Sequence, residues 1–195
     1  MSKKQDYPAG DFAIWIIIYI ELLTFALLFI GYAFARRENI SIFNESQLML
    51  NQTSGFMNTV ILITSSYFVA KAVESIKQFA QESTSVANEK ASRWLIATIV
   101  FGIIFLVIKS MELSAIFSEG IHLSTNTFFM FYLLLSIFHF MHVILGLIII
   151  WNIYKQTTIY AYTFEKHEGM ETGASYWHLL DLLWIVLFPL LYIMH

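Results

Sequence analysis

The sequence has 195 residues, of which 58% are hydrophobic and only 13% are charged. Soluble proteins carry about a quarter charged residues, so a soluble domain of this size could not cover its surface with so few charges. The formal net charge is −3 and no basic patch stands out, which gives no reason to expect a nucleic-acid partner. There is no cysteine, which excludes disulfides, thiolate zinc sites and iron–sulfur clusters. The bilayer must therefore be the solvent for much of the chain.

Five apolar stretches are long enough to cross a membrane as helices, which takes about 20 residues. We predict spans over 12–34, 56–78, 93–117, 127–154 and 175–194. The first stretch is longer than the core of a signal peptide, which is about 7–15 residues, so we expect a retained helix. The segments between the spans are too short for a separate soluble domain. The sequence therefore predicts an all-α fold, with residues 1–195 forming one membrane bundle of five transmembrane helices.

The basic residues predict the orientation of the chain, because cytoplasmic loops carry an excess of Lys and Arg. The amino terminus and the second and fourth loops hold most of these residues: Lys3, Lys4, Lys77, Lys90, Arg93, Lys155 and Lys166. The opposite side has only Arg36 and Arg37. We therefore predict a cytoplasmic amino terminus and an external His195.

Glu21 is the sharpest polar feature of the first span. It lies near the middle of that span, with no charged neighbour one helical turn away. An ionisable group at this depth costs several kcal/mol, so it needs a reason to be there. Burial disfavours the charged form, and we expect the carboxyl group to be protonated or bonded to a partner helix. Two roles stay open: a proton or lipid-headgroup site, and a structural hydrogen bond between helices.

Two ion pairs are predicted near the ends of the second and third spans. Lys71 and Glu74 are three residues apart, and so are Lys109 and Glu112. Residues with this spacing lie on one face of a helix, and pairing lowers the cost of keeping each charge in the membrane. We interpret Lys71 and Glu74 as an interfacial pair whose lysine reaches toward the headgroups. For Lys109 and Glu112, a structural and a functional role stay open.

The fourth span carries His139 and His142 near mid-depth, and Ser136 and Gly146 extend the same face. Small and polar residues on one face favour close helix contact. A bis-histidine haem would need an opposed histidine at similar depth, and we place His178 too near the cytoplasmic end of the fifth span. We therefore predict that both histidines bond to neighbouring helices and ligate no metal.

His178 and Asp181 lie one turn apart on the fifth span and can face a common neighbour, in a structural or a functional role. Tyr176 and Trp177 are interpreted as aromatic anchors at the membrane interface. Small polar side chains along the second span are predicted to serve helix packing: Asn58, Ser65 and Ser66.

Motifs on all five spans resemble the subunit III family of haem–copper oxidases. They are Glu21-Leu22-Leu23-Thr24-Phe25, Asn58-Thr59, Lys109-Ser110-Met111-Glu112, Phe138-His139-Phe140-Met141-His142-Val143 followed by Gly146, and Tyr176-Trp177-His178-Leu179-Leu180-Asp181-Leu182-Leu183-Trp184. Each motif is weak alone, but five in the right order on successive helices indicate the family. Mitochondrial-type members have seven spans, so the chain resembles the shorter forms of bacterial quinol oxidases and of the nitric oxide reductase accessory branch (NorE-like proteins). The small size, the loop that begins at Arg36 and the Lys109–Glu112 segment favour the second of these.

The resemblance implies an accessory subunit with no catalytic site of its own. Its partners would be a catalytic haem–copper subunit and membrane phospholipid, and it would support assembly, stability or proton uptake in a bacterial cell membrane. No cofactor is expected in this chain, because the family keeps haem and copper in the partner. Glu21 corresponds to a family glutamate that reacts with hydrophobic carbodiimides.

Two sets of site residues follow. Candidates for a proton or lipid site are Glu21, Glu112, His139, His142, His178 and Asp181, and candidates for polar helix packing are Asn58, Thr59, Lys109, Ser136 and Gly146. The main alternative function is an independent proton-coupled transporter that uses Glu21, His139 and Asp181. A membrane haem enzyme is the second alternative.

Overall fold

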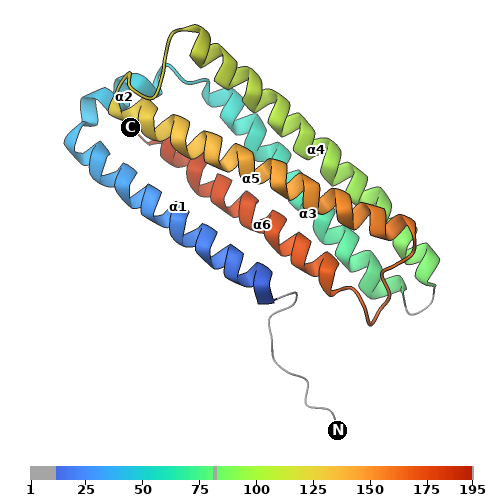
Figure 1. The fold of residues 1–195 in the computed structure, drawn as a ribbon. Coiled ribbons are helices and arrows are strands. Elements are labelled where there is room, and N and C mark those ends of the chain that lie inside the picture. Colours follow the sequence, from blue (N-terminus) through green and yellow to red (C-terminus); the bar gives the residue numbers. More distant parts are fainter. Residues whose placement is uncertain (1–11, 81–82, 195) are drawn as a thin grey trace.

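The computed structural model describes residues 12–80 and 83–194, and these residues form helices with no strand. The elements are α1 (Phe12–Glu38), α2 (Ile40–Gln47), α3 (Gln52–Phe79), α4 (Thr84–Ser118), α5 (Thr127–Thr158), α6 (Glu168–Phe188) and a π-helical turn η1 (Pro189–Ile193). Five of the described helices are long and apolar enough to span a membrane: α1, α3, α4, α5, and α6 together with η1 (Figure 1). The short helix α2 is not. The predicted all-α fold with five spanning helices is confirmed, and the protein is a multi-pass membrane protein.

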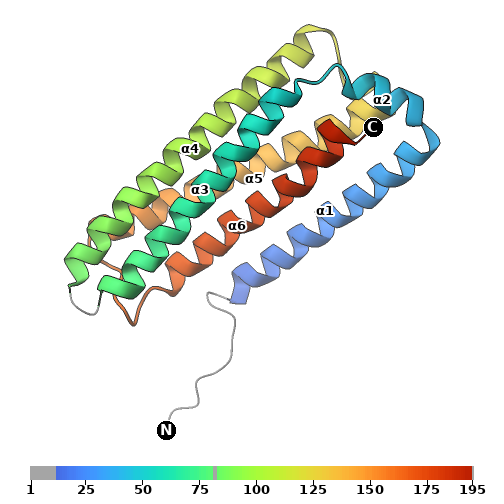
Figure 2. The ribbon, with the colours of Figure 1, turned by 180° about the vertical axis from the view of Figure 1, so that it is seen from behind.

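The spanning helices run antiparallel to one another in chain order (Figure 1). One end of the bundle, which we call the amino-terminal end, holds the starts of α1, α4 and α6 and the ends of α3 and α5. The short helix α2 and η1 lie at the opposite, carboxyl-terminal end. Helix α1 is at the edge of the bundle, where it contacts α2, α5 and α6. Figure 2 shows α3, α6 and α1 side by side on one face, with α6 in the middle. Lys3, Lys4 and His195, on which the predicted orientation partly rests, lie outside the described residues.

Asparagine side chains mark the starts of two helices at the carboxyl-terminal end. Asn51 Oδ1 accepts a hydrogen bond from the backbone N–H of Ser54 at 3.0 Å, and Asn126 Oδ1 accepts one from that of Phe129 at 2.8 Å. These bonds satisfy N–H groups that the first turn of a helix leaves without partners. Gly120 follows the end of α4 with φ at +76°, a backbone conformation that glycine adopts without strain.

Two helices begin well before the predicted spans. Helix α4 begins at Thr84 and α6 at Glu168, because polar turns continue each helix at the amino-terminal end of the bundle. The apolar span that includes α6 and η1 runs from Glu168 to Ile193, and His178 is close to its middle. His178 is thus farther from the helix start than the sequence indicated, and its depth in the membrane stays a prediction. The polar residues that start α6 had been assigned to a loop.

Helix α2 was not predicted, and it helps to hold the end of the chain. Gln47 is fully buried, and its Nε2 donates to the carbonyl oxygens of Leu190 at 3.1 Å and Leu191 at 3.2 Å. Arg36 donates to the carbonyl oxygen of Met194 at 2.5 Å. The last carbonyls of a helix lack partners within it, so these side chains satisfy them. The predicted loop that begins at Arg36 is in fact the last turn of α1.

Trp177 is the packing centre between α4, α5 and α6. Its side chain is fully buried, and Tyr176 beside it is 2% exposed. A Cβ atom added to Gly102 of α4 would lie 2.9 Å from Trp177 Cη2, and one added to Gly146 of α5 would lie 3.1 Å from its Cε3. The absence of side chains at these glycines lets the large indole fit between the helices. The interpretation of Tyr176 and Trp177 as interfacial anchors is therefore wrong.

Candidate functional site

Glu21 of α1 contacts His142 of α5 near the middle of both helices. Glu21 Oε2 lies 2.8 Å from His142 Nε2, and the two side chains are 19% and 11% exposed. The other ring nitrogen, His142 Nδ1, lies 2.6 Å from the carbonyl oxygen of Phe138. Phe25 packs edge-on against the same imidazole, with ring centroids 5.8 Å apart. The edge helix α1 is thus joined to the centre of the bundle by a polar contact.

These two contacts restrict where hydrogens lie in the Glu21–His142 pair. A carbonyl oxygen can only accept a hydrogen bond, so His142 Nδ1 must carry a hydrogen. The contact between His142 Nε2 and the carboxyl oxygen also needs a hydrogen, because two lone pairs repel at 2.8 Å. A pair that shares a single proton, on the carboxyl group or on the ring, is neutral overall in both forms, which lowers the cost of placing it inside a membrane.

Lys109 of α4 is a fully buried lysine held by a closed network. Its Nζ donates to the hydroxyl oxygens of Tyr132 at 3.2 Å and Tyr192 at 2.6 Å, and it lies 3.3 Å from Glu112 Oε2. The two tyrosine hydroxyls donate in turn to Glu112 Oε1, at 2.7 Å and 2.5 Å. The π-helical turn η1 supplies Tyr192, and α5 supplies Tyr132. A buried ion pair is stable only when further hydrogen bonds support both charges, and the tyrosines provide them.

Trp184 of α6 connects this network to α3. The ammonium group of Lys109 lies 5.4 Å from the centroid of the Trp184 ring system. The indole Nε1 donates to Thr59 Oγ1 at 3.0 Å, and Thr59 Oγ1 donates to the carbonyl oxygen of Gly55 at 2.9 Å. The Trp184 ring also packs against His139, with ring centroids 5.3 Å apart. Thr59, a predicted packing residue, therefore has a specific polar role between α3 and α6.

Asn58, Ser136 and His139, also predicted from the sequence, are fully buried. Within the part of the chain that the structure describes, neither ring nitrogen of His139 and neither polar atom of the Asn58 amide has a hydrogen-bond partner. His142 does bond to a neighbouring helix, as predicted, but His139 does not. The His139 ring lies instead among aromatic side chains of α1, α4 and α6.

Ser66, His178 and Asp181 form a third polar group, where α3 meets α6. His178 Nδ1 lies 2.5 Å from Ser66 Oγ and 3.7 Å from Asp181 Oδ2. The Asp181 carboxyl group is buried, and neither of its oxygens has a hydrogen-bond partner among residues 12–80 and 83–194. The His178 side chain, in contrast, is 45% exposed on the outer face of the bundle. The common neighbour that the sequence predicted for His178 and Asp181 is on α3.

The sequence did not reveal Ser66, Tyr132 and Tyr192 as members of these polar groups. A tyrosine near a helix end is usually an interfacial anchor, and a serine inside a span usually serves packing. Only the relative positions of the helices make these residues partners of Lys109 and His178. In the described ranges, no three His, Cys, Asp or Glu side chains are arranged to hold a metal ion.

Comparison with known proteins gives the family. The family model for cytochrome c oxidase subunit III matches residues 45–195, which contain α3 to α6 and four of the five motifs. The chain belongs to the cytochrome c oxidase subunit III family. The identification made from the motifs is therefore confirmed at the level of the family. Glu21 lies before the matched range, but its partner His142 lies within it.

Relatives within the subunit III family cover most of the chain. Subunit 3 of the cytochrome bo(3) ubiquinol oxidase of Buchnera aphidicola is 29% identical over 182 residues, which are 93% of this chain and 85% of that protein. Subunit 3 of the cytochrome c oxidase of Synechocystis is 32% identical over 139 residues, or 71% of this chain and 55% of that protein. A probable cytochrome c oxidase subunit 3 of Mycobacterium tuberculosis is 27% identical over 172 residues, or 88% and 81%. The chain thus spans about half of the Synechocystis protein and most of the other two.

Proposed function

We propose that this chain is an accessory subunit of a respiratory haem–copper complex in a bacterial cell membrane. The observation that carries the proposal is the subunit III family match over residues 45–195. The relatives are named as subunits of cytochrome c and ubiquinol oxidases. In the proposal, haem and copper belong to the catalytic partner, and this chain supports the assembly, stability or proton uptake of that partner.

The polar group of Ser66, His178 and Asp181 supports a docking face on α3 and α6. His178 is close to the middle of its span, and nearly half of its side chain is exposed on the outside of the bundle. A polar imidazole that faces lipid at this depth loses the hydrogen bonds that water would supply. A helix of the catalytic subunit with a polar side chain at the same depth would bond to His178 Nε2, the ring nitrogen that does not face Ser66. The row of α3, α6 and α1 in Figure 2 is therefore the face that we assign to the partner.

The Glu21–His142 contact supports a role in proton uptake. A proton that is shared over 2.8 Å between a carboxyl group and an imidazole can change its position without adding net charge to the membrane. A lipid-headgroup role for Glu21 has less support, because the carboxyl group lies near the middle of α1 and is already bonded to His142. We therefore favour proton transfer over headgroup binding as the role of Glu21.

Two finer assignments depend on the identity of the partner. We favour the nitric oxide reductase accessory branch on the Lys109–Glu112 segment, although the relatives described above are subunits of oxidases. The transporter alternative would need Glu21, His139 and Asp181 to share one path. No described hydrogen bond joins the three side chains: Glu21 contacts His142, His139 lies among aromatic rings, and Asp181 lies beside His178. We do not propose that alternative.

Copurification from native membranes tests the proposed function. The tagged chain should bring down one large haem–copper subunit, whose sequence decides between oxygen and nitric oxide as the substrate of the complex. His178→Leu should reduce the yield of that subunit, whereas His122→Leu, in the exposed loop after α4, should not. A stoichiometric Soret absorption band from the isolated chain would overturn the proposal. Reduction of dioxygen or nitric oxide by the chain alone would do the same.

A further inference from the structure

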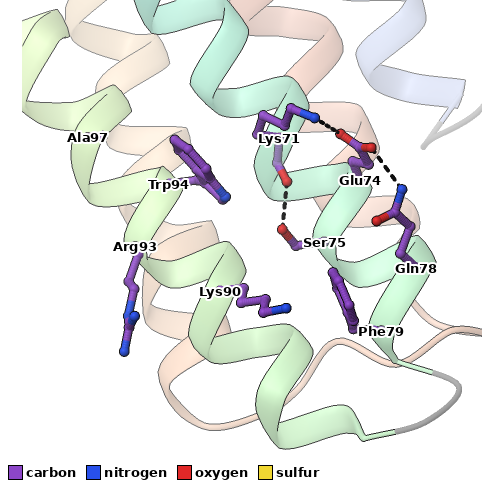
Figure 3. A pocket seen from close by; sticks show the side chains of 9 residues that line it. All are labelled: Lys71, Glu74, Ser75, Gln78, Phe79, Lys90, Arg93, Trp94 and Ala97. Atoms are coloured by element: carbon purple, nitrogen blue, oxygen red, sulfur yellow. Dashed lines mark hydrogen bonds and ion pairs between the residues drawn. The ribbon is translucent and has the colours of Figure 1, made fainter.

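A separate polar feature lies between α3 and α4 at the amino-terminal end of the bundle. A groove of about 580 Å³ is lined there by three basic residues, Lys71, Lys90 and Arg93, and by the single carboxylate of Glu74 (Figure 3). The aromatic rings of Phe79 and Trp94 form part of the same lining. The charged lining residues therefore leave the groove with a net charge of +2. None of them belongs to the three polar groups described above.

The positive charges of the groove are only partly neutralised. Lys71 Nζ lies 2.6 Å from Glu74 Oε2, and Glu74 also accepts a hydrogen bond from Gln78. The ammonium group of Lys90 lies 3.4 Å from the centroid of the Phe79 ring, and Figure 3 shows it extending from α4 toward that ring. Among the residues with a described placement, no carboxylate forms an ion pair with Lys90 or Arg93. An anion would therefore find basic groups that no carboxylate of the described chain occupies.

The position of the groove along the helices favours a lipid as the source of that anion. Lys90 lies six residues after the start of α4, about 9 Å along a helix that rises 1.5 Å per residue, so it is within reach of the headgroup layer. Trp94 stacks on Phe68, with ring centroids 5.6 Å apart, in the manner of interfacial aromatic residues. Toward the middle of the membrane, exposed apolar side chains continue along both helices: Ile63, Tyr67, Ile96 and Val100. These side chains offer a surface to acyl chains, which a free phosphate ion would not need.

We propose that the α3–α4 groove binds an anionic phospholipid. Its phosphate contacts Lys90 and competes with Glu74 for Lys71, while Arg93 adds positive charge at the α4 side of the groove. Its acyl chains lie along the exposed apolar side chains of α3 and α4. Basic pockets between membrane helices bind anionic headgroups in this way. The proposal needs only that the chain spans a membrane, so it can fail without affecting the proposed partner, and the reverse also holds.

Native mass spectrometry of the detergent-purified full chain tests the groove. Added phosphatidylglycerol should bind more tightly than phosphatidylcholine of the same chain length. Lys90→Gln should weaken phosphatidylglycerol binding about fivefold, because a basic residue near an anionic lipid surface contributes about 1 kcal/mol. Lys90→Arg, which keeps the charge, should bind as the unchanged chain does. Lys155→Gln is the matched control. Lys155 also lies at the amino-terminal end of the bundle, and its ammonium group is 5.8 Å from the ring centroid of Trp151. It is on α5, however, outside the groove.

Four results would overturn the proposal. Equal binding of the two lipids would remove the role of charge, and equal losses in Lys90→Gln and Lys155→Gln would remove the role of the groove. Displacement of the lipid by a low excess of inorganic phosphate would show a site for the free ion. If Lys90→Gln kept its lipid but lost the copurifying large subunit, the groove would be a protein interface.

Discussion

Removal of Lys109 should destabilise the protein strongly, because it breaks an ion pair whose two side chains are only 1% and 7% exposed. In Lys109→Met a side chain of similar length replaces the lysine, and the carboxylate of Glu112 then keeps only the hydroxyls of Tyr132 and Tyr192 as partners. Breaking a buried pair on one side costs about 3–5 kcal/mol, because the remaining charge is left without its counterion. We therefore expect the free energy of unfolding of Lys109→Met to fall by about that amount.

The double variant Lys109→Met/Glu112→Gln separates the charge from the packing. Because this variant buries no unpaired charge, it should lose less stability than the two single variants together, by about 0.5–3 kcal/mol. Unfolding by sodium dodecyl sulfate in mixed micelles, followed by tryptophan fluorescence, measures all three variants. Lys71 and Glu74 are the matched control, since they have the same spacing and a shorter distance of 2.6 Å but are 36% and 42% exposed. Lys71→Met should therefore change the stability little.

Two results would refute this reasoning about burial. If Lys71→Met cost as much as Lys109→Met, the distance between the charges would decide the effect and burial would not. If the double variant lost the sum of the single losses, Lys109 and Glu112 would act independently, in spite of the 3.3 Å between their charged groups.

Three further predictions concern the centre of the bundle. Glu21→Gln should keep the chain in the membrane but abolish its labelling by a hydrophobic carbodiimide, as measured by mass spectrometry; persistent labelling would mean that another carboxyl group reacts. Gly146→Ala should lower the free energy of unfolding by about 1–3 kcal/mol, because its Cβ would lie 2.7 Å from a leucine methyl carbon of α6. Gly31→Ala, whose Cβ would lie 3.5 Å from its nearest neighbour, is the control and should be nearly neutral. His139→Phe should keep or raise the stability in the same assay, since an imidazole without hydrogen bonds is replaced by an apolar ring, whereas His142→Phe should lower it.

The five spanning helices could be predicted from the sequence because length and apolar character decide whether a segment can cross a bilayer. The ends of the helices could not be predicted as well. The polar turns that begin α4 and α6 look like loop residues, since nothing local distinguishes a helix that projects from the membrane from a chain that leaves it. Helix α2 is too short and too polar to stand out, and its packing depends on Gln47 bonding to carbonyls more than 140 residues away in the sequence.

The polar contacts also divide into those that could be predicted from the sequence and those that could not. Pairs on one helix, such as Lys109 with Glu112, could be predicted because a spacing of three residues places side chains on one face. Contacts between helices depend on how far each helix is shifted and rotated against its neighbours, which the sequence of one chain does not state. The bond between Glu21 and His142 and the two tyrosines around Lys109 are therefore visible only in the structure.

The polar side chains that lack hydrogen bonds in the described structure differ in whether a partner protein can reach them. His139 and the amide of Asn58 are enclosed on all sides, so no other protein can reach them without opening the bundle. Asp181 lacks hydrogen bonds as well, but its neighbour His178 is exposed at the same depth on the outer face of α6. A partner helix that bonds to His178 Nε2 would therefore hold the imidazole against Ser66 and Asp181. This difference is why the docking test uses His178, and why a loss of the partner on changing His139 would instead indicate a change in the fold of this chain.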